Sequence, residues 1–170
     1  MSITLSIIIA TLIYVLYNVV SVKIFGVPES LSNTYYLYKE KWGLGFLFPI
    51  MMLLVVSFMM PAWIVLSEGS IFQFLSFLAP ACLVFVGTAP AFKTYGLENK
   101  VHSYSAYIAA ACSLLWVVLV THLWWVIPIW IGIIGLLSLS SKTLKSCLVY
   151  WLEQIAFGST FTAAILFSLI

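Results

Sequence analysis

Charged side chains are scarce in this sequence, and two charged residue types are missing altogether. The 170 residues include no arginine and no aspartate, so all seven cations are lysines and all five anions are glutamates. The charged fraction of 7% compares with about 25% in an ordinary globular domain. So few charges cannot build the polar surface that a water-soluble chain of this length needs. A net charge of +2 without a basic cluster also argues against nucleic acid as a partner.

Cysteine and histidine are too few and too widely spaced for a metal site or a disulfide framework. Cys82, Cys112 and Cys147 form no CxxC motif. His102 and His122 lie 20 residues apart, which is about 30 Å along a helix and too far to share a metal ion. We therefore expect no metal, no cofactor and no disulfide framework.

Apolar residues make up 64% of the chain and are gathered in long runs. Because a spanning helix needs about 20 mainly apolar residues to cross roughly 30 Å of hydrocarbon, these runs predict an all-α, polytopic transmembrane bundle of about six helices. Five helices with one re-entrant segment is the alternative. The bundle forms a single transmembrane domain, residues 1–170, and its expected helices are 3–22, 44–66, 71–92, 104–120, 123–139 and 147–170.

The fourth and fifth expected helices are separated only by Thr121 and His122. One continuous helix through both would run to about 50 Å, which is too long for a bilayer. We therefore predict a tight antiparallel hairpin, with the two helices packed side by side.

The lysines predict how the chain is oriented in the membrane. Under the six-helix arrangement all of them fall in the first, third and fifth connections; they are Lys23, Lys39, Lys41, Lys93, Lys100, Lys142 and Lys145. Cytoplasmic loops carry an excess of lysine and arginine, so these connections are expected in the cytoplasm and both termini outside it. The expected location is the cell (inner) membrane.

The longest connection runs from Lys23 to Gly43. Its Pro28–Leu31 stretch, with proline early and glutamate in the first turn, is typical of a helix start. A short helix lying in the membrane interface and a plain connector anchored by tyrosines both fit, and whether the segment binds a partner stays open.

Three short segments carry a resemblance: residues 27–36 (VPESLSNTYY), 85–90 (FVGTAP) and 101–104 (VHSY). In them the chain resembles an uncharacterised group of small multi-pass bacterial and phage membrane proteins. The resemblance implies a multi-pass membrane architecture and no catalytic residue.

Glu153 is the polar residue that is hardest to explain. An acid well inside the last helix costs about 2.5–3.5 kcal/mol on insertion scales, so it should face protein or water. Gln154 lies beside it, and groups at comparable depth are Asn18, Thr88 and Tyr107, which we predict as its partners. The alternatives are a structural hydrogen bond between helices and a proton or cation site.

Small residues recur every four positions on two of the expected helices. Such rows allow helix backbones to approach closely in lipid, and they fit contacts within the chain, a homo-oligomer or another membrane protein equally well. The rows are Ser105, Ala109 and Ser113 on the fourth helix, and Ala156, Thr160 and Ala164 on the sixth.

Three functional classes follow, in this order of expectation. The first is a membrane protein without enzymatic activity that acts as an accessory, scaffold or partner-binding subunit, surrounded by the lipid bilayer. The second is a small transporter or channel that uses Glu153. The third is a membrane enzyme built around His102, a serine and Glu98, although no GxSxG motif supports it.

The orientation is testable with single cysteines placed near Ser2 and Ser168 in a background without the native cysteines. Because the lysine-bearing loops are expected in the cytoplasm, a membrane-impermeant thiol reagent should label both sites on intact cells. Labelling of either site only after the cytoplasmic side is opened would contradict the predicted orientation.

Overall fold

The computed structural model describes residues 2–93 and 96–170, and within them all the regular secondary structure is helical. This confirms the predicted all-α bundle. In chain order the seven helices are α1 (Ile3–Phe25), α2 (Thr34–Trp42), α3 (Leu47–Leu66), α4 (Leu75–Thr88), α5 (Gly96–Leu119), α6 (Val126–Ser140) and α7 (Leu148–Phe167).

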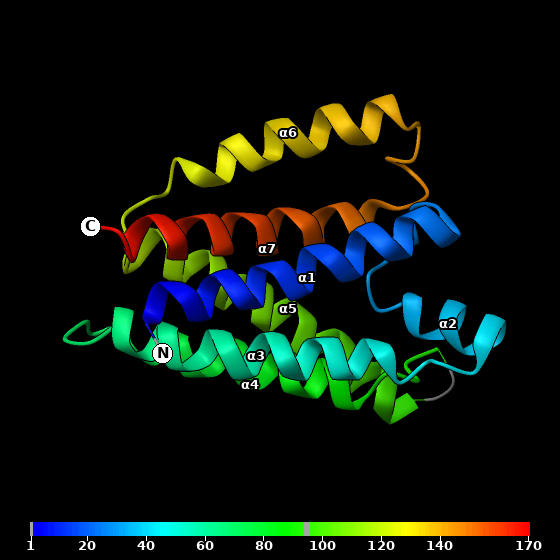
Figure 1. Ribbon diagram of the computed structural model, residues 1–170, viewed down its shortest axis with the longest axis horizontal. Coiled ribbons are helices and arrows are strands. Elements are labelled where there is room, and N and C mark those ends of the chain that lie inside the picture. Colours follow the sequence, from blue (N-terminus) through cyan, green and yellow to red (C-terminus); the bar gives the residue numbers. More distant parts are fainter. Residues whose placement is uncertain (1, 94–95) are drawn as a thin grey trace.

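Six of these helices run along the long axis of the molecule, and the short α2 lies at one end (Figure 1). The chain passes up and down, so that the N- and C-termini lie at the same end, on the left of Figure 1. The lysines lie toward the opposite end, in the last turn of α1, in α2, near the start of α5 and in the connections after α4 and α6. We call the two ends the terminus end and the lysine end.

Three helices within the described residues, α1, α3 and α5, are long and apolar enough to cross a membrane. The helices α4 and α6 are apolar but shorter. Several boundaries differ from those predicted. The helix α5 begins at Gly96 rather than near residue 104, and α4 begins at Leu75 rather than near residue 71. A periodic apolar pattern locates the middle of a helix better than its ends, because ends depend on capping and on neighbours.

The connection after α1 contains a short helix, which is one of its two expected forms, but that helix does not begin at Pro28. Residues 26–33 form bends and turns, and the short helix α2 starts only at Thr34. Gly43 caps the C-terminal end of this helix. Its left-handed backbone (φ 71°) lets its N–H donate to the carbonyls of Lys39 and Tyr38.

The predicted hairpin of α5 and α6 is wrong in one respect. The two are separate helices, with His122 in a positive-φ conformation (57°) between them. They do not pack side by side, since α7 packs against both and lies between them (Figure 1). Residues 120–125 form the connection. Six extended residues span up to roughly 20 Å, which covers the roughly 16–20 Å between two helices that flank a third.

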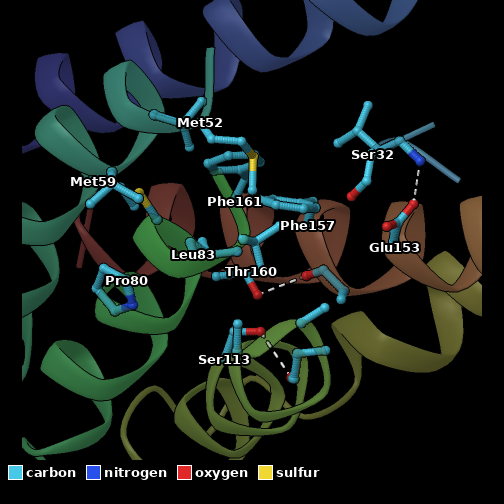
Figure 2. Close-up of a pocket in the computed structure, with 18 of the residues that line it drawn as sticks. Ser32, Met52, Met59, Pro80, Leu83, Ser113, Glu153, Phe157, Thr160 and Phe161 are labelled. Atoms are coloured by element: carbon cyan, nitrogen blue, oxygen red, sulfur yellow. Dashed lines mark hydrogen bonds between the residues drawn. The ribbon is translucent and has the colours of Figure 1, made fainter. Parts of the chain in front are cut away.

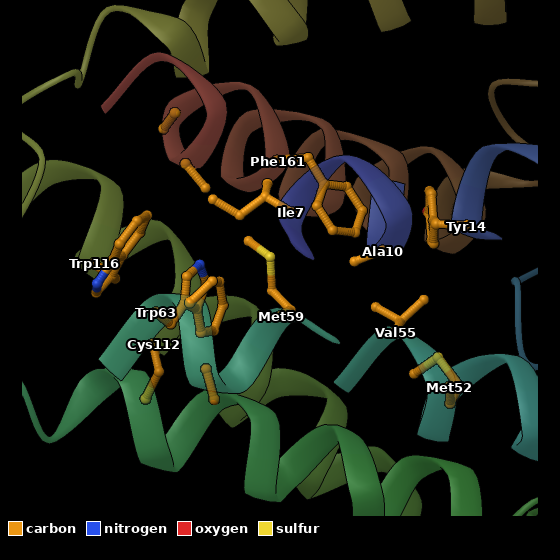
Figure 3. Close-up of a cluster of buried hydrophobic side chains, with 14 of the residues drawn as sticks. Ile7, Ala10, Tyr14, Met52, Val55, Met59, Trp63, Cys112, Trp116 and Phe161 are labelled. Atoms are coloured by element: carbon orange, nitrogen blue, oxygen red, sulfur yellow. The ribbon is translucent and has the colours of Figure 1, made fainter. Parts of the chain in front are cut away.

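The core lies where α1, α3, α4, α5 and α7 meet (Figure 3). Ile7, Phe48, Val55 and Trp116 are each no more than 1% exposed. The Trp116 ring stacks on Trp63, with centroids 5.2 Å apart. The two rows of small residues lie on the buried faces of α5 and α7, which pack against each other; they are Ser105, Ala109, Ser113, Ala156, Thr160 and Ala164.

The outermost helix, α6, is fixed to α7 through a close approach at Gly158. A Cβ atom added to Gly158 would lie 2.6 Å from the Trp130 ring. That ring is held in place because its Nε1–H donates to Thr162 Oγ1 at 3.0 Å. Only glycine therefore fits at this position without moving α6.

We expect Gly158→Ala to lower the thermal stability in detergent, because overpacking costs about 1–3 kcal/mol. The matched control is Gly132→Ala on α6, where an added Cβ meets nothing within 4 Å and gains helix propensity of up to about 1 kcal/mol. Melting curves followed by tryptophan fluorescence make the comparison. Equal melting temperatures for the two variants would contradict the close contact.

Candidate functional site

The segment of residues 26–33 folds into the lysine end of the bundle and is held there by the start of α7. Leu31 is only 2% exposed and joins the core. The backbone N–H of Tyr150 donates to the carbonyl of Glu29 at 3.1 Å, and the Cys147 thiol donates to the carbonyl of Val27 at 3.4 Å. We call this segment the inserted loop.

Glu153, in the second turn of α7, faces the inserted loop. One of its carboxyl oxygens, Oε2, accepts the backbone N–H of Leu31 at 2.6 Å. The predicted partners are therefore wrong. Tyr107 is 72% exposed, the Thr88 hydroxyl bonds to the carbonyls of Val84 and Phe85 in its own helix, and Asn18 belongs to a different cluster. The sequence predicted a partner for Glu153 on another helix, whereas the observed partner is the backbone of the inserted loop.

His102, near the start of α5, fastens the same loop from another side. Its Nδ1 lies 3.0 Å from the carbonyl oxygen of Ala89, and its Nε2 lies 2.9 Å from Ser32 Oγ. Because a carbonyl only accepts, a neutral ring donates from Nδ1 and receives the Ser32 hydroxyl proton at Nε2. Phe92 stacks on the ring with centroids 4.4 Å apart.

A serine hydroxyl bonded to an imidazole is also the arrangement of a nucleophile and its base. The enzyme alternative called for His102, a serine and Glu98 in one cleft. The structure brings Ser32 to the ring, but Glu98 is exposed and the Ala89 carbonyl occupies Nδ1. Both Ser32 and His102 are at least 95% buried, so the hydrogen bond between them holds the inserted loop in place.

A small cavity of about 70 Å³ lies beside Glu153, enclosed by α3, α4, α5 and α7 (Figure 2). Its walls are mostly apolar, with Met52, Met59 and Phe161 among them. The volume is well below the roughly 300–1,000 Å³ of ligand sites. The transport alternative called for a wide, water-accessible cavity at Glu153, and this one is narrow and apolar.

Gln154 takes part in a second polar cluster, between α1 and α7. Its Nε2–H donates to Asn18 Oδ1 at 3.2 Å, and its Oε1 accepts the Tyr14 hydroxyl at 3.1 Å. The Tyr150 hydroxyl also donates to Asn18 Oδ1, at 3.3 Å, and Asn18 Nδ2–H donates to the carbonyl of Tyr14 at 3.0 Å. We call Tyr14, Asn18, Tyr150 and Gln154 the amide cluster.

The amide cluster lies at the floor of a groove of about 580 Å³. Helices α1 and α6 form its sides and α7 its floor, and α1 and α6 are not among the helix pairs that pack closely. The apolar walls include Val15, Val19 and Trp130, and Lys23, in the last turn of α1, lines the groove toward the lysine end. This volume falls within the usual range of ligand sites.

Of the residues that line the groove, sequence reasoning singled out Asn18 and Gln154 but missed Tyr14, Tyr150 and Lys23. A signal was available for two of them. Tyr14 precedes Asn18 by four residues and Tyr150 precedes Gln154 by four, so each pair lies on one helix face. A polar face on each of two otherwise apolar helices indicates that the two helices pack together through those faces.

Among the described residues, no group of three or more histidine, cysteine, aspartate or glutamate side chains is placed to hold a metal ion. In comparisons with family models, curated proteins and solved structures, the chain has no match. The resemblance to small multi-pass bacterial and phage membrane proteins therefore stays a prediction.

We expect Glu153→Gln to be tolerated and Glu153→Leu to lower thermal stability in detergent. The amide oxygen of glutamine can still accept the Leu31 N–H, whereas leucine leaves that buried donor unpaired, at a cost of about 1–3 kcal/mol. Limited proteolysis between residues 26 and 33 should accelerate in the leucine variant alone. If both substitutions leave melting and proteolysis unchanged, Glu153 does not hold the inserted loop.

Proposed function

We propose that this chain is a six-span protein of the cell membrane, without enzymatic activity, that binds a membrane lipid in the groove between α1 and α6. The outer surface supports membrane residence, because large apolar side chains face outward along its length. Leu12, Leu16 and Leu136 are 62%, 67% and 73% exposed. Patches of that kind on a monomer mark contact with lipid or with another protein.

The proposed spans are α1, α3, α4, α5, α6 and α7. At 14 and 15 residues, α4 and α6 are about 21–23 Å long, which is short for the roughly 30 Å of hydrocarbon. Apolar residues extend each at its N-terminal side, Phe72 and Phe74 before α4, and Trp124 and Trp125 before α6. Aromatic side chains of this kind prefer headgroup depth.

The distribution of lysine supports the proposed orientation. Lys23 lies in the last turn of α1, and Lys93 and Lys142 lie in the connections after α4 and α6. These places are at the lysine end, while both termini lie at the other end (Figure 1). Basic residues concentrate on the cytoplasmic side, so the lysine end is proposed to face the cytoplasm.

The groove is the observation that carries the proposed lipid-binding function. It offers about 580 Å³ on the side of the bundle, where a molecule from the surrounding bilayer can enter between α1 and α6 without crossing the core. By contrast, the polar groups of the small cavity and of the inserted loop bond within the chain. Glu153 bonds to Leu31 and His102 to Ser32 and Ala89, which favours a structural role for both over transport or catalysis.

The groove can be closed with one substitution and a neighbouring control. Val15 lines the groove, whereas Leu16, on the same helix turn, is exposed and does not. After purification in mild detergent, native mass spectrometry should find one phospholipid bound to the wild type and to Leu16→Trp. Val15→Trp should lose it, because the indole projects from α1 into the part of the groove where an acyl chain would lie.

Two results would contradict this proposal. Retention of lipid by Val15→Trp at the wild-type level would place the lipid elsewhere. A wild-type dimer that dissociates in Val15→Trp but not in Leu16→Trp would make the groove an interface between copies of the chain.

A further inference from the structure

We infer that the groove selects an anionic glycerophospholipid, with the phosphate bound by Lys23 and the glycerol ester groups beside the amide cluster. This inference rests on the proposed lipid-binding function and adds the chemical class of the lipid. Three observations support it: a lysine without an ion-pair partner, an amide hydrogen-bond donor deeper in the groove, and the spacing between the two.

The cation is Lys23, in the last turn of α1. It is exposed and is the sole charged side chain among the described residues that line the groove. The ion pair found in the described part of the chain joins Lys93 to Glu29, and no described carboxylate pairs with Lys23.

The donor is the side-chain amide of Gln154, which lines the groove beside Asn18. A primary amide carries two N–H groups. Asn18 donates one N–H to the Tyr14 carbonyl, and Gln154 donates one N–H to Asn18 Oδ1. The Asn18 amide also interacts with the Tyr14 hydroxyl, so in the residues that the structure describes the second N–H of Gln154 is the one left for a ligand. Ester carbonyls accept hydrogen bonds and cannot donate them, so they complement this group.

The spacing agrees with a lipid that stands upright in the bilayer. Asn18, to which Gln154 is hydrogen-bonded, precedes Lys23 by five residues on α1, which places it about 7.5 Å deeper along the helix. In a glycerophospholipid the ester groups likewise lie just below the phosphate. Farther toward the terminus end than Asn18, the walls available to an acyl chain are largely apolar and include Val15, Trp130 and Phe161, with Thr11 and Thr162 beside them.

A competition experiment tests the headgroup. The purified protein in detergent is offered equal amounts of phosphatidylglycerol and phosphatidylcholine with identical chains, and native mass spectrometry measures the ratio bound. We expect the wild type to favour phosphatidylglycerol about fivefold, since one basic residue near a membrane contributes about 1 kcal/mol. In Lys23→Gln the ratio should fall to about one, and Lys23→Arg should restore the preference.

The matched control is Lys145→Gln, which removes a charge at the lysine end from a residue that does not line the groove, and it should keep the wild-type ratio. An unchanged ratio in Lys23→Gln, or equal binding of both lipids by the wild type, would overturn the anionic headgroup while leaving lipid binding in place. A wild type that binds neither lipid would overturn both this inference and the proposed function.

Discussion

The hydrogen bond between the Glu153 carboxyl and the backbone N–H of Leu31 determines how the lysine end of the molecule is built. This hydrogen bond holds the inserted loop against α7, where Leu31 is only 2% exposed. Ser32 then lies against His102, and the loop joins α1 to both α5 and α7. An acid in an apolar helix needs a partner, and here loop backbone supplies one. Glu153 thus serves to close one end of the bundle.

The position of α7 has a second consequence, on the side of the molecule. Because α7 lies between α5 and α6, the last hairpin cannot close, and α6 contacts the bundle mainly through α7. The contact at Gly158 and Trp130 holds α6 close to α7, while α1 packs on α3 and α7 instead of on α6. The groove is the space that this arrangement leaves, and the amide cluster lies at its floor because α1 and α7 meet there.

Sequence reasoning predicted six apolar runs of about 20 residues, and each run overlaps one of the helices α1, α3, α4, α5, α6 and α7, although α4 and α6 are shorter than their runs. It misplaced the start of α5, since residues 96–103 mix charged and polar side chains, which a membrane span excludes and a helix accepts. It identified Glu153 and Gln154 because polar side chains in an apolar helix cost free energy unless they are paired. It predicted the wrong partners for Glu153. Burial of the inserted loop depends on contacts far apart in the chain, and nothing in the local pattern of residues 26–33 indicates it. The separation of α5 from α6 was missed for the same reason.

The central claim is that α1 and α6 stand apart and hold a lipid between them. An experimental density map of the protein in lipid nanodiscs tests it most directly. The account predicts an elongated density between α1 and α6 that contacts Val15 and Trp130 and reaches toward Lys23. A map in which α1 and α6 pack directly against each other, with the groove closed, would contradict it.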